Sequence, residues 1–166
     1  MLIVQKRAAP QARADLELHL PFELRRRARQ RAALASGEEV GLFLERGTLL
    51  RGGDCLLADD GRIVRVVAAQ ENLMEVKSED ADALTRAAYH LGNRHCPVEI
   101  GAGALRFPAD RVIEQMLSGM GLAVTSISAP FEPEGGAYAA GHHHHSSDAK
   151  HAGIIHDFAP GAGGKR

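Results

Sequence analysis

Six histidines lie close together near the end of the chain, within residues 142–156. They are His142, His143, His144, His145, His151 and His156. Neutral imidazole binds Ni²⁺, Cu²⁺ and Zn²⁺, so this segment is a candidate metal binder whose affinity falls as the pH drops through about 6.5. A purification tag is the alternative. Tags usually have longer histidine runs at a terminus, whereas 21 residues follow His145 here, so we favour metal binding.

A second group of candidate ligands lies in the segment YHLGNRHCP, residues 89–97. His95 and Cys96 are adjacent in it, and His90 precedes them; imidazole and thiolate are both metal ligands. One histidine holds an ion weakly, but a twofold axis can bring two copies of His95 together. Taken alone, His95 is more simply explained as an ordinary polar loop residue, and Cys96 is at least as simply explained as a packed thiol. We expect the other cysteine, Cys55, in the core.

Three arginines alternate in the segment LRRRARQRAAL, residues 24–34. The segment contains good helix formers, but the spacing of Arg27, Arg29 and Arg31 places them on one face of a strand. We favour a strand that turns at residues 36–37 into a second strand. The arginines then form either a partner-binding face or a solvated one.

Residues 1–72 predict a small all-β domain. Leu16, Leu18 and Leu20 alternate with polar residues, as in a half-buried strand, and glycine-containing turn signals separate further apolar runs. The apolar runs are residues 2–4, 41–44 and 62–67.

Residues 73–131 predict the element order β-α-β-β-α-β, which is the ferredoxin-like arrangement and makes the whole chain an α+β protein. We expect Ser78 to cap the first helix and Gly92 to follow its end. We expect Pro108 to open the second helix. The apolar face predicted for this second helix is Val112, Ile113, Met116, Leu117 and Met120. Residues 132–166 have few large apolar side chains, so we expect a disordered tail.

Composition excludes several classes of protein. The net charge of −1 gives no global field for nucleic acid or membrane, and no 18-residue apolar run predicts a membrane helix. The first residues do not resemble a signal peptide, so we expect a cytoplasmic protein. No catalytic triad, phosphate loop or paired-carboxylate motif is recognisable, so we do not expect an enzyme.

The run Gly92-Asn93-Arg94-His95, at the end of a predicted helix, resembles the signature of the urease accessory protein UreE family of nickel metallochaperones. The resemblance extends over nearly the whole chain. It includes the segment GLFLERGTLLRGGD at residues 41–54, the ferredoxin-like order and the His-rich end. The combination in this order is specific, although GNRH alone is short.

This resemblance implies a homodimer, formed through the second domain, in which His95 of each protomer binds one Ni²⁺. The tail histidines would add ligands, and the ion would pass to apo-urease together with the accessory GTPase. It also implies that the first domain binds a peptide or protein partner. Arg111 stands where some relatives have a peripheral histidine ligand, so no peripheral site is expected there. Cys96 would add a soft ligand that favours copper or zinc, and His90 is a further candidate ligand.

Two other functions remain open at this point. A general metal-storage or detoxification protein would use the tail alone, with the second domain as a dimerisation scaffold. A peptide-binding chaperone would act through the first domain, with metal binding incidental.

Overall fold

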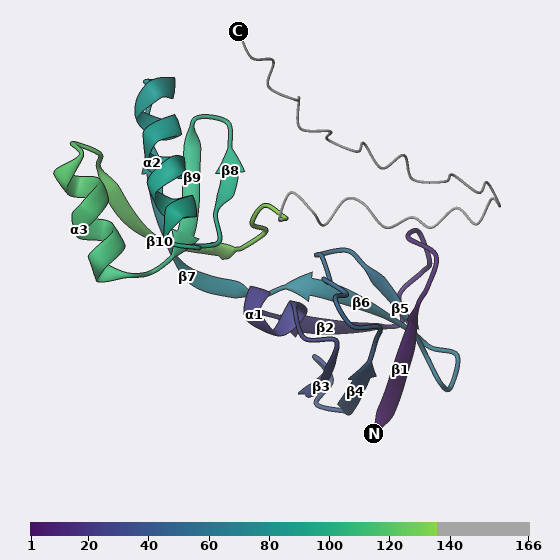
Figure 1. Ribbon diagram of the computed structural model, residues 1–166. Helices are drawn as coiled ribbons and strands as arrows, with labels where there is room; N and C mark the ends of the chain where they lie inside the picture. Colours follow the sequence, from purple (N-terminus) through teal and green to yellow (C-terminus); the bar gives the residue numbers. More distant parts are fainter. Residues whose placement is uncertain (136–166) are drawn as a thin grey trace, which may run out of the picture. The chain divides into compact units, whose positions relative to one another are not determined.

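The computed structural model describes residues 1–135, which form one compact unit built from two β-sheets (Figure 1). The tail histidines named above therefore lie outside the described residues. None of the helices within residues 1–135 is long and apolar enough to cross a membrane.

The first sheet has six strands in the order β2-β6-β5-β1-β4-β3. β1 is parallel to β4 and β2 is parallel to β6, whereas the other neighbours are antiparallel. The elements are β1 (Leu2–Arg7), β2 (Leu16–Leu20), α1 (Phe22–Arg25), β3 (Arg29–Ala33), β4 (Glu39–Phe43), β5 (Cys55–Ala58) and β6 (Ile63–Ala68). One face of this sheet encloses a core of Leu and Val side chains that includes Leu18, Val40 and Leu56.

The strand predicted over residues 24–34 is only partly correct. α1 ends at Arg25 and β3 begins at Arg29, so Arg27 lies between two elements and outside the strand. Arg29 and Arg31 are exposed on one face of β3, as the alternation predicted. The sequence signal was mixed because a helical turn and a strand share this short segment. Cys55 is buried in β5, as expected.

The second sheet has the order β10-β7-β9-β8, all antiparallel, with two helices in the connections. Its elements are β7 (Gln70–Lys77), α2 (Ala81–Asn93), β8 (Glu99–Gly101), β9 (Ala104–Pro108), α3 (Arg111–Gly119) and β10 (Val124–Pro130). This is the predicted β-α-β-β-α-β order. α2 and α3 lie against the same face (Figure 1), where Leu91, Phe107 and Leu117 are fully buried.

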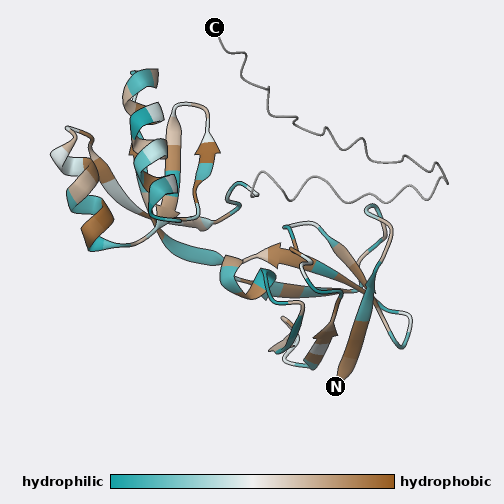
Figure 2. Ribbon diagram, viewed as in Figure 1, coloured by the Kyte–Doolittle hydropathy of each residue, from teal (hydrophilic) through white to brown (hydrophobic). Residues whose placement is uncertain are grey.

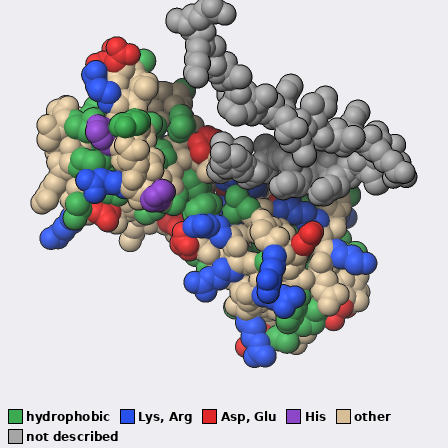
Figure 3. All heavy atoms as spheres, in the orientation of Figure 1, with side chains coloured by type: hydrophobic (Ala, Val, Ile, Leu, Met, Phe, Trp, Pro, Cys, Tyr) green, Lys and Arg blue, Asp and Glu red, His purple; other side chains and the backbone are tan. Residues whose placement is uncertain are grey.

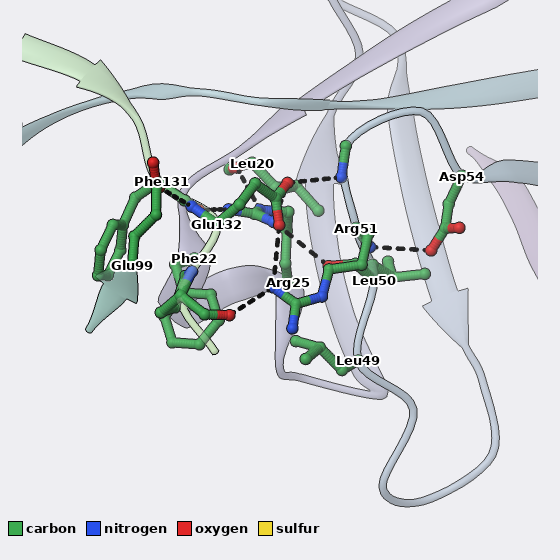
Figure 4. A network of polar contacts seen from close by, with 12 residues as sticks. Leu20, Phe22, Arg25, Leu49, Leu50, Arg51, Asp54, Glu99, Phe131 and Glu132 are labelled. Atoms are coloured by element: carbon green, nitrogen blue, oxygen red, sulfur yellow. Dashed lines mark hydrogen bonds and ion pairs between the residues drawn. The ribbon is translucent and has the colours of Figure 1, made fainter. Parts of the chain in front are cut away.

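The side chain of Arg25 joins the two sheets and is completely buried (Figure 4). Its guanidinium donates to the carbonyls of Leu20 and Leu50 from the first half of the chain, at 3.2 and 3.4 Å. It also donates to the carbonyl of Phe131 and, at 2.7 Å, to the Glu132 carboxylate. A buried charge is tolerated only with such partners, so Arg25 holds the end of β2, the loop before β5 and the segment after β10 together.

The Glu132 carboxylate receives two further interactions at this junction. Arg51 Nη1 lies 3.1 Å from one carboxylate oxygen, and the Gly52 amide donates to the other at 2.7 Å. A β-carbon at Gly52 would lie 2.9 Å from that oxygen, so a larger residue there would displace the carboxylate from its partners. Burial alone raises the pKa of Glu132, but the Gly52 amide and both arginines outweigh burial and lower it. Because its pKa is lowered in the folded protein, the Glu132 carboxylate stabilises the fold at pH values above the ordinary carboxyl pKa. This stabilisation is lost as the pH falls through the pKa of the folded protein.

Replacement of Arg25 by alanine is expected to cost roughly 2–4 kcal/mol of unfolding free energy, because three carbonyls and Glu132 lose their donor. Urea unfolding measures the loss. Arg27→Ala is the matched control, because Arg27 is exposed two residues away, and its effect is expected within about 0.5 kcal/mol. Equal effects of the two substitutions would show that the junction does not depend on Arg25.

Candidate metal centre

His95 lies directly beyond the end of α2, a helix with one buried face. Ala87 and Leu91 anchor that face against the second sheet. The Asp80 carboxylate caps its first turn by accepting from the amides of Asp82 and Ala83, at 2.9 and 3.2 Å. The predicted cap, Ser78, instead accepts from the Asp80 amide. The sequence prediction was therefore wrong by two residues, and Asp80 fixes the start of the helix that carries His95.

The helix ends in a Schellman motif with His95 at its left-handed position. The His95 amide donates to Gly92 O at 2.9 Å, and the Cys96 amide donates to Leu91 O at 3.1 Å. His95 has φ +54°, the only positive φ of a non-glycine residue within residues 1–135. The expectation that Gly92 fills this position was wrong, because the helix continues through Gly92 to Asn93. An imidazole therefore stands where glycine is the usual residue, at a cost in backbone free energy.

This turn directs neighbouring side chains to different environments. His95 is exposed, whereas Cys96 is half-buried and contacts the apolar cluster that contains Leu91. Burial, with a smaller contribution from Asp110, raises the pKa of the Cys96 thiol. Cys96 would therefore have to lose both its packing and its proton to bind a metal, whereas the side chain of His95 is already exposed.

His90, the second candidate ligand on α2, lies in the last turn of the helix and is exposed. Its ring meets that of Tyr89 edge to face, with centroids 5.3 Å apart. Figure 3 shows histidine side chains on the surface of the part that contains α2 and α3. Tyr89 itself is 66% exposed, although it is a large aromatic side chain.

The neighbouring helix α3 begins at Arg111 and not at Pro108, which ends β9. Asp110 caps it by accepting from the amides of Val112 and Ile113, at 2.7 and 3.0 Å. Val112, which the sequence placed on the apolar face, is 61% exposed, while Ile113 is buried as predicted. The helix starts later than the proline suggested, so Asp110 and not Pro108 fixes which face is buried. The two helices touch where Arg94 Nε lies 3.2 Å from Met116 Sδ.

Within residues 1–135 no three metal-binding side chains gather in one place. The third histidine of this region, His19, lies in β2 beside Glu17 at 3.3 Å. The described part of one chain thus places two exposed imidazoles near the end of α2, those of His90 and His95. A complete coordination shell requires ligands from a second chain or from beyond the described residues. The six tail histidines, from His142 to His156, belong to the latter group.

The left-handed turn predicts an unusual pattern of substitution effects. His95→Gly is expected to be at least as stable as the unchanged protein and about 1 kcal/mol more stable than His95→Ala, because alanine keeps the strain. Gly92→Ala is the matched control. It is expected to stabilise by roughly 0.5–1 kcal/mol, since Gly92 is helical and open space surrounds its missing β-carbon. Urea unfolding measures all three; destabilisation by Gly92→Ala would show that Gly92 takes the left-handed position after all.

Two family models match this chain, and together they cover most of it. The model described as UreE urease accessory protein, N-terminal domain, matches residues 3–69, and the model for the C-terminal domain matches residues 71–158. The second match contains α2, the left-handed His95 and the tail histidines.

Curated relatives agree with the family models. The chain is 51% identical over 162 residues to the urease accessory protein UreE of Pseudomonas fluorescens strain Pf0-1, covering 95% of this chain and 98% of the relative. It is 53% identical to the protein of the same name in Ectopseudomonas mendocina, with the same coverage. It is 54% identical over 138 residues to that of Alkalilimnicola ehrlichii, covering 83% of this chain and 85% of the relative. Because family models match both of its halves and relatives about 50% identical cover up to 95% of its length, the chain belongs to the UreE family of urease accessory proteins.

Proposed function

We propose that this protein carries Ni²⁺ for assembly of the urease metallocentre and is not itself an enzyme. The observation that carries the proposal is the exposed imidazole of His95, held at a left-handed helix end where glycine would be more stable. A residue retained against its local cost points to a function of the side chain. Membership of a family of urease accessory proteins supports urease as the proposed destination of the ion.

The proposed site is formed at a twofold axis by His95 from each protomer of a homodimer. Two imidazoles leave most positions of a Ni²⁺ shell for exchangeable ligands, which suits transfer of the ion better than retention. His90 and the tail histidines from His142 to His156 are proposed to supply additional ligands and raise the local metal concentration. Cys96 contributes least, because its thiol packs against the core and its pKa is raised.

The helix layer of the second sheet supports the dimer. Tyr89 near the end of α2 and Val112 in the first turn of α3 are large apolar side chains that the single chain leaves in solvent. Burial of each in a dimer interface would contribute roughly 1.5–3 kcal/mol. The proposed partners beyond the dimer are the accessory GTPase and apo-urease, placed in the cytoplasm.

Titration of the protein with Ni²⁺ distinguishes the proposed carrier function from a storage function. His95→Gly is expected to weaken the tightest site at least about tenfold, or about 1.4 kcal/mol, while the fold is kept. Deletion of residues 141–166 is expected to leave one ion per dimer. Isothermal calorimetry with parallel mass measurement gives both, and repeats with Zn²⁺ and Cu²⁺ measure selectivity.

A storage or detoxification protein would give the opposite result. The deletion would then remove nearly all bound metal, and His95→Gly would change nothing. His95→Gly is a sharper test than His95→Ala, because it removes the imidazole without adding strain at the turn.

The dimer has its own test. Val112→Glu is expected to raise the dimer dissociation constant at least about tenfold, because it places a charge in an apolar contact. Analytical ultracentrifugation over a range of concentrations measures the change. Phe43→Ser, which alters another exposed apolar residue, in the first sheet, is the control and is expected to leave the dimer unchanged. An unchanged dimer in Val112→Glu would place the interface elsewhere.

A further inference from the structure

The outer face of the first sheet carries large apolar side chains that the fold does not bury. We use this name for the face opposite the core, which presents Met1, Ile3, Gly41, Phe43 and Leu57. Phe43 is 47% exposed and Met1 59%. The start of β1, which contains Ile3, has the hydrophobic colour in Figure 2. Exposed apolar side chains that gather in one place, unlike scattered ones, mark interaction surfaces.

These side chains form one cluster because Gly41 leaves room for them. Ile3 pairs with Gly41 in the parallel ladder between β1 and β4. A β-carbon at Gly41 would lie 3.0 Å from Phe43 Cε2, 3.2 Å from Ile3 Cδ1 and 3.8 Å from Met1 Cε. The three side chains therefore converge over a position without a side chain, and they form a continuous apolar surface.

A hollow adjoins this cluster where the ladder between β1 and β5 is irregular. The register shifts between Val4 and Lys6, which opens the sheet locally. The resulting hollow has a volume of about 180 Å³ and is lined by Ile3, Gln5, Lys6, Leu57, Ala58 and Asp59. Its size suits one apolar side chain of a partner, and Ile3 joins it to the cluster over Gly41.

Two arginines border the cluster on its other side. In the antiparallel ladder Arg29 pairs with Phe43 and Arg31 with Gly41, so both guanidinium groups extend from the same face. Both are exposed, and neither takes part in a salt bridge among the described residues. Figure 3 shows basic side chains on the surface of this part of the protein. The face thus combines an apolar centre, a hollow and two cations without an acidic partner.

We propose that this outer face docks an acidic amphipathic segment of a protein partner. An apolar side chain of the segment enters the hollow beside Leu57, and its carboxylates pair with Arg29 and Arg31. Nucleic acid fits less well, because Glu39 and Asp59 lie on the same face and its centre is apolar. The inference goes beyond the nickel function, since it uses neither His95 nor a metal.

The test uses two fluorescein-labelled peptides of twelve residues. One has a central Leu-Phe pair flanked on both sides by Asp and Glu; the other has Lys at every acidic position. Fluorescence anisotropy with the full chain measures binding at low and high salt. The acidic peptide is expected to bind at least tenfold more tightly than the basic one, and added salt is expected to reduce the difference.

Variants assign the binding to this face. The double change Arg29→Glu and Arg31→Glu is expected to weaken binding of the acidic peptide at least tenfold. Phe43→Ser or Leu57→Ser is expected to weaken this binding at least threefold. Arg13→Glu, which reverses another exposed arginine outside the strands, is the matched control and is expected to change nothing. All these side chains are exposed, so the fold is kept, and unfolding curves check this.

Three results would overturn the proposal. One is equal binding of the two peptides or no binding of either. Another is an unchanged affinity in the arginine double variant. The third is a molecular mass of the protein in solution that rises with its concentration and is reduced by Phe43→Ser. This result would identify a second copy of this chain as the partner bound to the outer face. Nickel titration of the same variants is expected to be unchanged, so failure here is distinguishable from failure of the carrier function.

Discussion

The buried guanidinium of Arg25 is the constraint on which the rest of the structure depends. It satisfies backbone carbonyls from both halves of the chain and neutralises Glu132 in a place where water does not reach Arg25. Next to it Phe22 and Phe131 meet edge to face, 5.6 Å apart, over the fully buried Leu73. Residues of this apolar cluster come from both halves of the chain, and the charge network stabilises this arrangement of the segments, because separating them would leave a buried charge unpaired.

The network continues from this junction to the candidate metal centre. The Glu132 amide donates to the Glu99 carboxylate at 2.7 Å, and the Glu134 amide donates to Val98 O at 2.8 Å. Val98 and Glu99 follow the turn that contains His95. The turn is thus held at one end by the helix and at the other by the segment that Arg25 anchors. Rigid support on both sides explains how a histidine is kept at φ +54°, where a free chain would avoid it.

Sequence reasoning found what depends on local periodicity and missed what depends on distant partners. The alternation at Leu16, Leu18 and Leu20 and the order of the second domain came out correctly, because burial imposes those periods on the chain. The prediction for Gly92 was wrong because a glycine near a helix end usually takes the left-handed position after the helix. Here α2 continues through Gly92, and His95 takes that position. Arg25 gave no signal at all, since its carboxylate partner lies 107 residues away and it stands in a run of arginines.

The candidate site shows the same division. The sequence pointed to His95 through the GNRH signature, but only the structure shows why its neighbour Cys96 differs: one residue further along a Schellman turn the side chain points to the core. Likewise the alternating arginines were visible in the sequence, but their register with Phe43 and Gly41 was not. The two surfaces lie on different sheets that share one buried network. The position of the turn that carries His95 thus depends on the same buried network that holds segments of the first sheet in place.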